Sequence, residues 1–406
     1  MRLWFTLPTL CALALVAGCG KSEKNPMSPL DPAAAQQEVA AGYTDLAAGN
    51  YESANTHFKT ALVKDPNNPQ ANLGAAITEV YLVQNDPDVA PLIPYFDGTP
   101  ALAKRQAPEA SRASRTAAAL GLLGPRTSAH YDPVSGGAAM LRVMRLAADD
   151  PPAISEVQYV VKTKVMPKLA YAEARLNKIE QQPGFVLKIA PDVTGEPDSI
   201  EVDLGDILIL DSVINGVQGW LGLLVSYNFD VPSYEHVNAE SLLAEGTKFA
   251  TLHPDGALLL ANARNDFLTV KTRLDAAVTS IQGETDDQSD DLIPSEALAT
   301  QGFMDLVSSV TTVYNSLNGS VNVDVNDHNG DPFTFGLYIG RFFTPAIADL
   351  KTKFPAHAFD SSHDPYLIDP LTFDDPTING IFPDMTNARW QLLVGPVGPP
   401  PALTQR

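Results

Sequence analysis

The chain has 406 residues, a formal net charge of −21 at pH 7, and 45% hydrophobic residues. Such an excess of carboxylates repels nucleic acid and anionic lipid headgroups, which argues against proteins that bind either one. The length suffices for one large domain or two ordinary ones, with a core of their own. The two cysteines are Cys11 and Cys19. Cys11 falls in an N-terminal apolar segment, so we expect no disulfide in the mature protein.

The first residues have the order of a secretion signal. Arg2 supplies a positive charge, residues 3–16 are mostly apolar, and two small residues precede Cys19. The apolar run is shorter than the ~20 residues that a membrane-spanning helix needs. The run Val16-Ala17-Gly18-Cys19 resembles the lipobox of bacterial lipoproteins, in which an aliphatic residue and two small residues precede a lipidated cysteine.

The lipobox resemblance implies a signal peptide over residues 1–18 and a diacylglycerol on the thiol of Cys19. Because Gly20 stands where an Asp would favour the inner membrane, the resemblance implies an outer-membrane protein that faces the periplasm. The alternative is an ordinary secretion signal cut elsewhere. Residues 19–32 are polar and proline-bearing, so we expect a flexible tether there, with the lipid as the contact with the membrane.

Residues 33–95 show helical periodicity with two interruptions. Small residues stand where two helices would cross, aromatic residues fill the space between them, and a proline ends the second helix: Gly42, Tyr51, Ala54, Phe58 and Pro66. This pattern resembles the tetratricopeptide repeat. One repeat is complete, and a second begins at Gln70 and degrades from Pro87 onward. The resemblance implies an antiparallel helical hairpin.

In the tetratricopeptide family, the first helix of each repeat carries the face that binds peptides. By this resemblance the partner-binding residues are Gln36, Val39, Tyr43, Leu46 and Ala47, which lie on one stripe of a helix. The implied partner is another envelope or secretion protein. The alternative is that the same stripe packs on the rest of the chain.

Residues 96–354 are expected to form a larger, mainly helical domain. Apolar residues recur three or four positions apart over four long segments and a shorter last one: 153–182, 204–227, 258–281, 297–317 and 342–353. Pro167 interrupts the first segment, so we expect a kink or a break near Val165. The segment 204–227 is apolar enough to suggest a second membrane span. Its Asp206 and Asp211 favour a central buried helix, since a charge near a bilayer centre costs about 2.5–3.5 kcal/mol.

Two short hairpins are predicted from alternating apolar residues around turns. One pairs residues 185–190 with 199–204, and the other pairs 321–325 with 333–337. Proline, aspartate and glycine dominate residues 355–406, so we expect a loop-rich C-terminal tail. The predicted fold class is therefore mainly α, with a tetratricopeptide-like hairpin leading into a larger helical domain that carries two small β-hairpins.

One acidic turn is a candidate metal site. Five carboxylates crowd within it: Glu284, Asp286, Asp287, Asp290 and Asp291. Such a group binds a hard cation, so calcium is the candidate ion, with a solvated turn as the alternative. A second acidic stretch, residues 324–331, resembles an EF-hand loop only loosely, because Pro332 stands where glycine is needed.

The chain lacks the His-Glu-x-x-His, Gly-x-Ser-x-Gly, Walker and Gly-x-Gly-x-x-Gly motifs. We therefore predict a membrane-anchored lipoprotein that is not an enzyme and acts as a protein-interaction scaffold through its repeat. We expect no nucleic acid as partner and no cofactor beyond the candidate calcium. The alternative is a periplasmic ligand- or calcium-binding domain. A hydrolase without a recognisable motif is the third hypothesis.

Overall fold

The computed structural model describes residues 30–92, 152–182, 184–194, 197–231, 242–244, 246–285, 290–358 and 366–396. This part of the chain is predominantly helical and contains three small two-stranded antiparallel sheets. The predicted mainly α fold with two β-hairpins is therefore confirmed, and a third pair of very short strands accompanies it.

Three helices begin the described chain: α1 (Pro32–Ala48), α2 (Tyr51–Lys64) and α3 (Pro69–Val83). The side chains of Asp31 and Asn68 each accept a hydrogen bond from a backbone N–H three residues later, at 2.9 Å in both cases. A proline follows each cap, where its fixed φ suits the first turn of a helix. The sequence thus encodes the start of α1 and of α3 in the same way.

The ring of Phe58 on α2 is fully buried between α1 and α3. A β-carbon added to Gly42 would lie 2.7 Å from this ring, and one added to Gly74 would lie 2.5 Å from it. Both distances are shorter than real contacts of that kind, so both positions need glycine. Gly42 and the aromatic filler Phe58, both expected from the repeat pattern, therefore meet in space, and Gly74 joins them without having been predicted.

A long helical rod follows, made of α8 (Ile154–Val160), a π-helical turn (Val161–Val165) and α9 (Met166–Glu180). The predicted disturbance near Val165 is present, but as a π-helical turn and not as a break. Pro167 directly follows this turn, at the second residue of α9. Because the rod is helical on both sides, the missing N–H of Pro167 removes one hydrogen bond from the helix.

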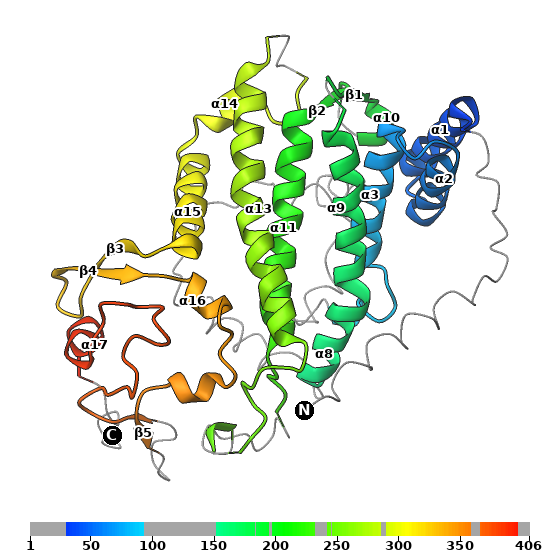
Figure 1. Ribbon diagram of the computed structural model, residues 1–406. Coiled ribbons are helices and arrows are strands. Elements are labelled where there is room, and N and C mark those ends of the chain that lie inside the picture. The colour runs from blue at the N-terminus through cyan, green and yellow to red at the C-terminus, as the bar shows by residue number, and fades with distance from the viewer. Residues whose placement is uncertain are drawn as a thin grey trace, which may run out of the picture.

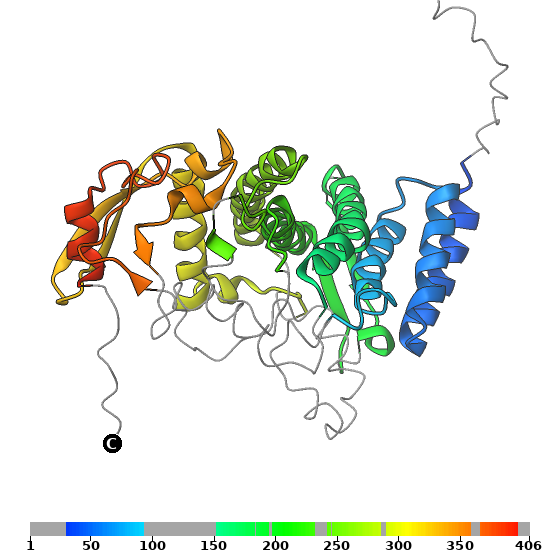
Figure 2. The ribbon, with the colours of Figure 1, turned by 90° about the horizontal axis from the view of Figure 1, so that it is seen from below.

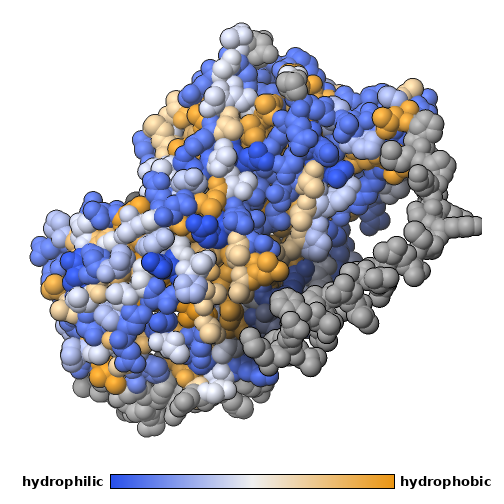
Figure 3. Space-filling model, viewed as in Figure 1, coloured by the Kyte–Doolittle hydropathy of each residue, from blue (hydrophilic) through white to orange (hydrophobic). Residues whose placement is uncertain are grey.

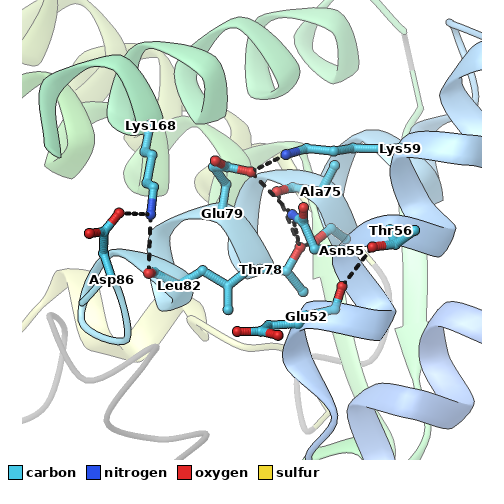
Figure 4. Close-up of polar contacts among 11 residues, drawn as sticks. Glu52, Asn55, Thr56, Lys59, Ala75, Thr78, Glu79, Leu82, Asp86 and Lys168 are labelled. Atoms are coloured by element: carbon cyan, nitrogen blue, oxygen red, sulfur yellow. Dashed lines mark hydrogen bonds and ion pairs between the residues drawn. The ribbon is translucent and has the colours of Figure 1, made fainter. Parts of the chain in front are cut away.

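Polar side chains join α2, α3 and α9 along one seam (Figure 4). Lys59 of α2 pairs with Glu79 of α3 at 2.6 Å, and Asn55 donates to the same carboxylate at 3.3 Å. Lys168 of α9 pairs at 3.0 Å with Asp86, which follows α3. The seam fixes the N-terminal helices against the rest of the molecule.

The first hairpin-like sheet consists of β1 (Val186–Ile189) and β2 (Ile200–Asp203), with the short helix α10 (Pro191–Thr194) in the connection. The strands are antiparallel, and Ile189 lies opposite Ile200. Alternate residues of a strand point to opposite faces. One face of this sheet is therefore apolar and turns toward the neighbouring helices, while α10 contacts α1.

The two longest helices, α11 (Leu204–Ser226) and α13 (Gly256–Gly283), pack against each other. Gly222 of α11 approaches Ala263 of α13 so closely that an added β-carbon would stand 2.9 Å from the alanine methyl. Small residues at a crossing let two backbones come near. This contact places α11 in the middle of the protein.

Of the described helices, α11 alone is long and apolar enough to cross a membrane. Its Asp211 is fully buried, and 56% of the apolar window is buried inside the protein. The helix contacts α9 on one side and α13 on the other. These contacts agree with the predicted central buried helix.

After α13 the chain forms α14 (Ser295–Leu298), α15 (Gln301–Asn318), and the hairpin β3 (Val321–Asn326) with β4 (Pro332–Leu337). The two strands are antiparallel over their whole length. This hairpin was predicted with nearly the same bounds, because its apolar residues alternate on either side of a turn rich in Asp, Asn and Gly.

The helix predicted for residues 342–353 is wrong. The structure has α16 (Gly340–Phe343) and a 3-10 turn (Leu350–Lys353), separated by an irregular stretch that contains Pro345. Proline lacks the N–H that a helix interior needs and disfavours helical backbone in the residue before it. One proline therefore divides a segment whose apolar spacing alone suggested a single helix.

The C-terminal tail is more ordered than its composition suggested. It contains the short strands β5 (His357–Ala358) and β6 (Tyr366–Leu367), and the helix α17 (Asn387–Val394), which the sequence analysis did not predict. The ring of Trp390 on α17 packs against Phe373, with ring centroids 5.1 Å apart. Tertiary packing of this aromatic pair stabilises a helix too short to form alone.

The main helices stand side by side in one row (Figure 1). The order in space is α1 and α2, then α3, α9, α11, α13 and α15, and each neighbouring pair is in contact. Seen from below, the same helices again follow one another in a row (Figure 2). The β3–β4 hairpin and the C-terminal segments lie beyond α15, at the end of the row opposite α1.

The face of the molecule seen in Figure 1 is mostly hydrophilic, with hydrophobic residues interspersed among polar ones (Figure 3). The interior is divided into several apolar clusters along the row. The largest cluster joins α3, α9, α11 and the β1–β2 sheet, and a cavity lies beside it.

Candidate functional site

The candidate site is an apolar cavity of about 80 Å³ between the N-terminal helices and the helical body. Three tyrosines line it, Tyr43 of α1, Tyr51 of α2 and Tyr81 of α3. The other apolar walls come from α1, α3, the β1–β2 sheet with α10, α11 and the segment after residue 290: Leu46, Leu73, Ile77, Ile189, Val193, Ile200, Val202, Ile207, Leu210 and Leu292. The cavity thus forms where the repeat-like hairpin meets the first sheet.

Local structure explains why these walls converge. Ile200 and Val202 alternate along β2, so both point to the same face of the sheet. The chain then enters α11 directly, and the first two turns of that helix add Ile207 and Leu210 to the walls. The Tyr51 and Tyr81 rings stack with centroids 3.6 Å apart and form part of the opposite side.

Tyr43 brings an unpaired hydroxyl to the cavity. Its ring meets the Phe58 ring edge to face, with centroids 5.3 Å apart, and this contact fixes the side chain. The hydroxyl oxygen is buried and has no hydrogen-bond partner among the described residues. Burial raises the pKa of Tyr43 well above its usual range, so the group is a neutral phenol. A buried hydroxyl without a partner costs free energy, which a ligand would recover.

Asp206 brings a buried carboxyl to the same cavity. It occupies the third position of α11 and forms a capping box with Asp203, in which each side chain accepts the other residue's backbone N–H at 3.1 Å. That bond uses Oδ2 of Asp206, and Oδ1 has no partner in the described part of the chain. Burial raises the pKa of Asp206 to about 8, and the carboxylates of Asp203, Glu284 and Asp291 act in the same direction. The side chain is therefore mainly protonated and neutral at pH 7.

The expected partner-binding stripe is not an open surface. Val39 is buried in the cluster around Phe58, and Tyr43 and Leu46 line the cavity that α10 and the first sheet help to enclose. Ala47 is half-buried, and Gln36 is exposed and donates a hydrogen bond to Gln70 at 2.9 Å. Most of the stripe faces the rest of the chain, which is the alternative that the sequence left open.

The described part of the acidic turn packs beside β2. Glu201 of β2 donates its backbone N–H to the carbonyl of Asp290 at 2.6 Å, and the Asp290 carboxylate pairs with Lys188 at 2.7 Å. Glu284 and Asp291 lie near the start of α11, close enough to raise the pKa of Asp206. The remaining two members of the predicted calcium site, Asp286 and Asp287, lie outside the described residues, as does the predicted lipidation site Cys19.

No group of three or more His, Cys, Asp or Glu side chains within the described ranges is arranged to hold a metal ion. In the looser EF-hand-like stretch, Oδ1 of Asp327 accepts hydrogen bonds from the backbone of Asn329 and Asp331 at 2.8 and 2.9 Å. That carboxylate therefore closes the β3–β4 turn.

A second polar group lies deeper in the row of helices, between α9, α11 and α13. Arg273 of α13 binds Asp211 of α11 at 2.8 Å and Glu180 of α9 at 2.7 Å. Asp211 is fully buried, and burial raises its pKa to about 7 against the effect of Arg273. One arginine thus forms ion pairs with two carboxylates that lie on different helices. This arrangement joins the three helices.

Neither the cavity nor the role of Asp206 was predicted from the sequence, in which Asp206 served only as an argument against a membrane span. The available signal was the pair Asp203 and Asp206 at the start of an apolar helix, which is the spacing of a capping box. That signal marks a helix start but cannot reveal which side chains from residues 43–81 will lie opposite.

Comparison of the chain with protein-family models, curated proteins and solved structures finds no match.

Proposed function

We propose that this protein binds a small apolar molecule in the cavity between α1, α3, the β1–β2 sheet and α11, and that it does so without chemical conversion. The observation that carries the proposal is the cavity itself, whose walls are almost wholly apolar and which contains two buried polar groups without hydrogen-bond partners in the described part of the chain. Ligand sites are typically apolar hollows with a few convergent polar groups. This function corresponds to the ligand-binding alternative from the sequence.

The chemistry of the walls supports binding over catalysis. Among the described residues that line the cavity, none is His, Cys, Ser, Lys or Arg. These are the side chains that most often serve as nucleophile, general base or oxyanion partner. Asp206 is neutral near pH 7 and Tyr43 is a neutral phenol, so each offers a hydrogen bond.

The lipobox-like sequence places this activity at a membrane. In the proposal, Cys19 holds the protein at the periplasmic face of the outer membrane by its lipid, and residues 19–32 act as the tether. Protein scaffolding through Gln36, Val39, Tyr43, Leu46 and Ala47 remains a hypothesis from the sequence. The geometry of this stripe favours ligand binding, because a peptide would have to displace the packing of Tyr43 and Leu46.

A neutral, unbranched hydrocarbon tests the proposal, because it suits a cavity of about 80 Å³. n-Pentane, titrated into the purified full-length mature chain in a sealed calorimeter, should bind with about one-to-one stoichiometry. Ile77→Phe and Leu210→Phe each place a larger side chain at the cavity wall, so both should weaken probe binding. Val63→Phe is the matched control, because Val63 is 77% exposed on α2 and does not line the cavity.

Probe binding by the parent protein and the three variants can either support or overturn the proposal. Probe binding that both wall variants reduce and the control leaves intact supports the cavity as the site. Absence of probe binding by the parent protein, or equal binding by all four proteins, would overturn the proposal. Circular dichroism on each variant separates loss of the site from loss of the fold.

A further inference from the structure

We propose that the cavity selects an uncharged, slender amphiphile, namely an alkyl chain with a single hydroxyl group, and rejects the corresponding carboxylate. This inference rests on the proposed ligand-binding function and adds the chemical class of the ligand. It follows from the two unpartnered polar groups, the charges around them and the size of the cavity.

The hydroxyl of Tyr43 supplies the first reason. Its oxygen is buried without a hydrogen-bond partner, although its ring is held in place by Phe58. Phenolic O–H groups both donate and accept. An apolar ligand with one hydroxyl would satisfy this group, whereas a pure hydrocarbon would leave it unpaired.

The carboxyl of Asp206 supplies the second reason. Its Oδ2 is occupied by the backbone N–H of Asp203, and its Oδ1 has no partner within the described chain although the residue is only 4% exposed. In its protonated form, a carboxyl both donates and accepts a hydrogen bond. Asp206 thus offers a second neutral contact for a hydroxyl group.

The surrounding charge argues against an anionic ligand. Asp203, Glu284 and Asp291 lie near Asp206 and act on its ionisation as like charges. The nearby Lys188 is already paired with Glu201 at 3.1 Å and with Asp290 at 2.7 Å. No cationic side chain lines the cavity among the described residues. A ligand carboxylate would therefore enter an apolar site beside several carboxylates without a counter-ion.

The size of the cavity restricts the shape of the ligand. A cavity of about 150 Å³ lined by aliphatic residues holds one benzene molecule. The cavity here is about 80 Å³ and is partly open to solvent. It therefore admits part of one unbranched chain and excludes a ring system or a two-chain lipid.

A matched series of eight-carbon probes tests the ligand class by calorimetry. The probes are 1-octanol, octanoate and octylammonium, which differ only in the end group. At about pH 6.5 Asp206 is protonated and octanoate is ionised, so 1-octanol should bind at least about tenfold more tightly than octanoate. Equal or tighter binding of octanoate would overturn the inference. Tightest binding of octylammonium would overturn it too, because Asp206 would then act as a counter-ion.

Two variants locate the polar contacts. Tyr43→Phe removes one hydroxyl that has no partner among the described residues, so the fold should persist while the affinity for 1-octanol falls about three- to tenfold. The affinity for n-pentane, which forms no hydrogen bond, should not fall. Tyr159→Phe is the control, because Tyr159 is 65% exposed on α8. An unchanged affinity for 1-octanol in Tyr43→Phe would contradict the assigned contact.

The pH profile tests Asp206. In the parent protein the affinity for 1-octanol should fall above about pH 8, where Asp206 loses its proton beside Asp203, Glu284 and Asp291. Asp206→Asn keeps an acceptor for the capping box and does not titrate, so its profile should be flat. Identical profiles in the two proteins would remove Asp206 from the inference.

Failure of this inference and failure of the proposed function give different results. If n-pentane binds and the wall variants block it, but 1-octanol shows no preference over octanoate, the cavity is a ligand site for another chemical class. If neither n-pentane nor 1-octanol binds, the proposed function itself fails.

Discussion

A β-carbon added to Gly74 would stand 2.5 Å from the ring of Phe58, a distance that no relaxed structure tolerates. Because the Phe58 ring is fully buried, it cannot move away into solvent. Gly74→Ala should therefore destabilise the protein by about 1–3 kcal/mol through overpacking, despite the better helix propensity of alanine. Urea denaturation followed by circular dichroism measures this change.

Gly216→Ala is the matched control for this prediction. Gly216 lies inside α11, and an added β-carbon would meet its nearest neighbour at an ordinary 3.7 Å. The substitution should be neutral or stabilise the protein by up to about 1 kcal/mol. Equal destabilisation by both substitutions would show that the close approach to Phe58 is not what constrains Gly74.

Arg273 should be among the most destabilising positions to change. Removing it leaves Asp211 and Glu180 without their cation, and Asp211 is fully buried. We expect Arg273→Met to reduce the free energy of unfolding by about 3–5 kcal/mol. The exposed pair of Lys164 and Asp88 provides the control, since Lys164→Met should leave the free energy of unfolding nearly unchanged.

The loss in free energy of unfolding caused by Arg273→Met should also depend on pH. Burial raises the pKa of Asp211 to about 7 even with Arg273 present, and loss of the arginine would raise it further. The native state of the variant would then hold protons that the unfolded state has released, so stability would fall as pH rises. Denaturation curves at about pH 6 and pH 8 test this pH dependence. A loss of stability, relative to the parent protein, that is smaller at pH 8 than at pH 6 would contradict it.

The buried carboxyl of Asp206 should make the free energy of unfolding of the parent protein depend on pH. Its pKa is about 8 in the native state, against about 3.9 for an aspartate in an unfolded chain. Between these values the native state keeps a proton that the unfolded state has lost, so Asp206 lowers stability progressively as pH rises from about 4 to 8. Asp206→Asn should remove this component and gain stability over the parent at about pH 8. The exposed Asp192→Asn serves as control, and an unchanged slope in Asp206→Asn would reject the assignment.

Asp375 should control the order of the C-terminal loop. Its carboxylate accepts hydrogen bonds from the Thr377 hydroxyl at 2.6 Å and from the Asn379 backbone at 2.7 Å, and it pairs with Lys353 at 3.0 Å. These bonds, the one from Thr377 foremost, hold the pKa of Asp375 well below its usual range. The stabilisation is therefore present above about pH 4 and lost as pH falls below it.

Asp375→Ala should speed amide exchange of Asn379 at neutral pH and leave exchange in α11 unchanged. Hydrogen–deuterium exchange with mass spectrometry resolves the two segments. Faster exchange in both would indicate a global effect and would contradict a role confined to the loop.

Cys19 is the residue on which the predicted membrane attachment depends. Cys19→Ser removes the thiol that the lipobox resemblance assigns to the diacylglycerol, so the variant should leave the membrane fraction or remain uncleaved. Fractionation followed by intact-mass measurement distinguishes these forms. A Cys19→Ser protein that fractionates and weighs as a lipidated chain would refute the anchor.

The sequence predicted helices best where apolar spacing is long and regular. The segments predicted at 204–227, 258–281 and 297–317 correspond to α11, α13 and α15 within a few residues at each end. Their apolar stripes need a packing partner whatever the topology is, so periodicity alone is sufficient. The interruption at Pro345 was missed because the apolar spacing around it continues as if the helix were intact.

The candidate site was much less predictable. Tyr43 belonged to the predicted stripe, but Ile200 and Asp206, which line the same cavity, are more than a hundred residues away in the chain. No local pattern specifies which distant segment will lie opposite Tyr43. Similarly, α17 depends on the packing of Trp390 against Phe373, a contact that the residue composition of the tail does not reveal.

The π-helical turn at residues 161–165 determines how α8 is oriented about its own axis. Such a turn accommodates one residue more than an α-helical turn does. If the same residues formed a regular α-helix instead, the additional residue would rotate α8 by about 100° relative to α9. Val157 and Val160 would then turn away from Val225 and the apolar cluster they share with it. The π-helical turn therefore keeps the first helix in the body of the protein in phase with α9, and deleting one residue there should preserve that phase.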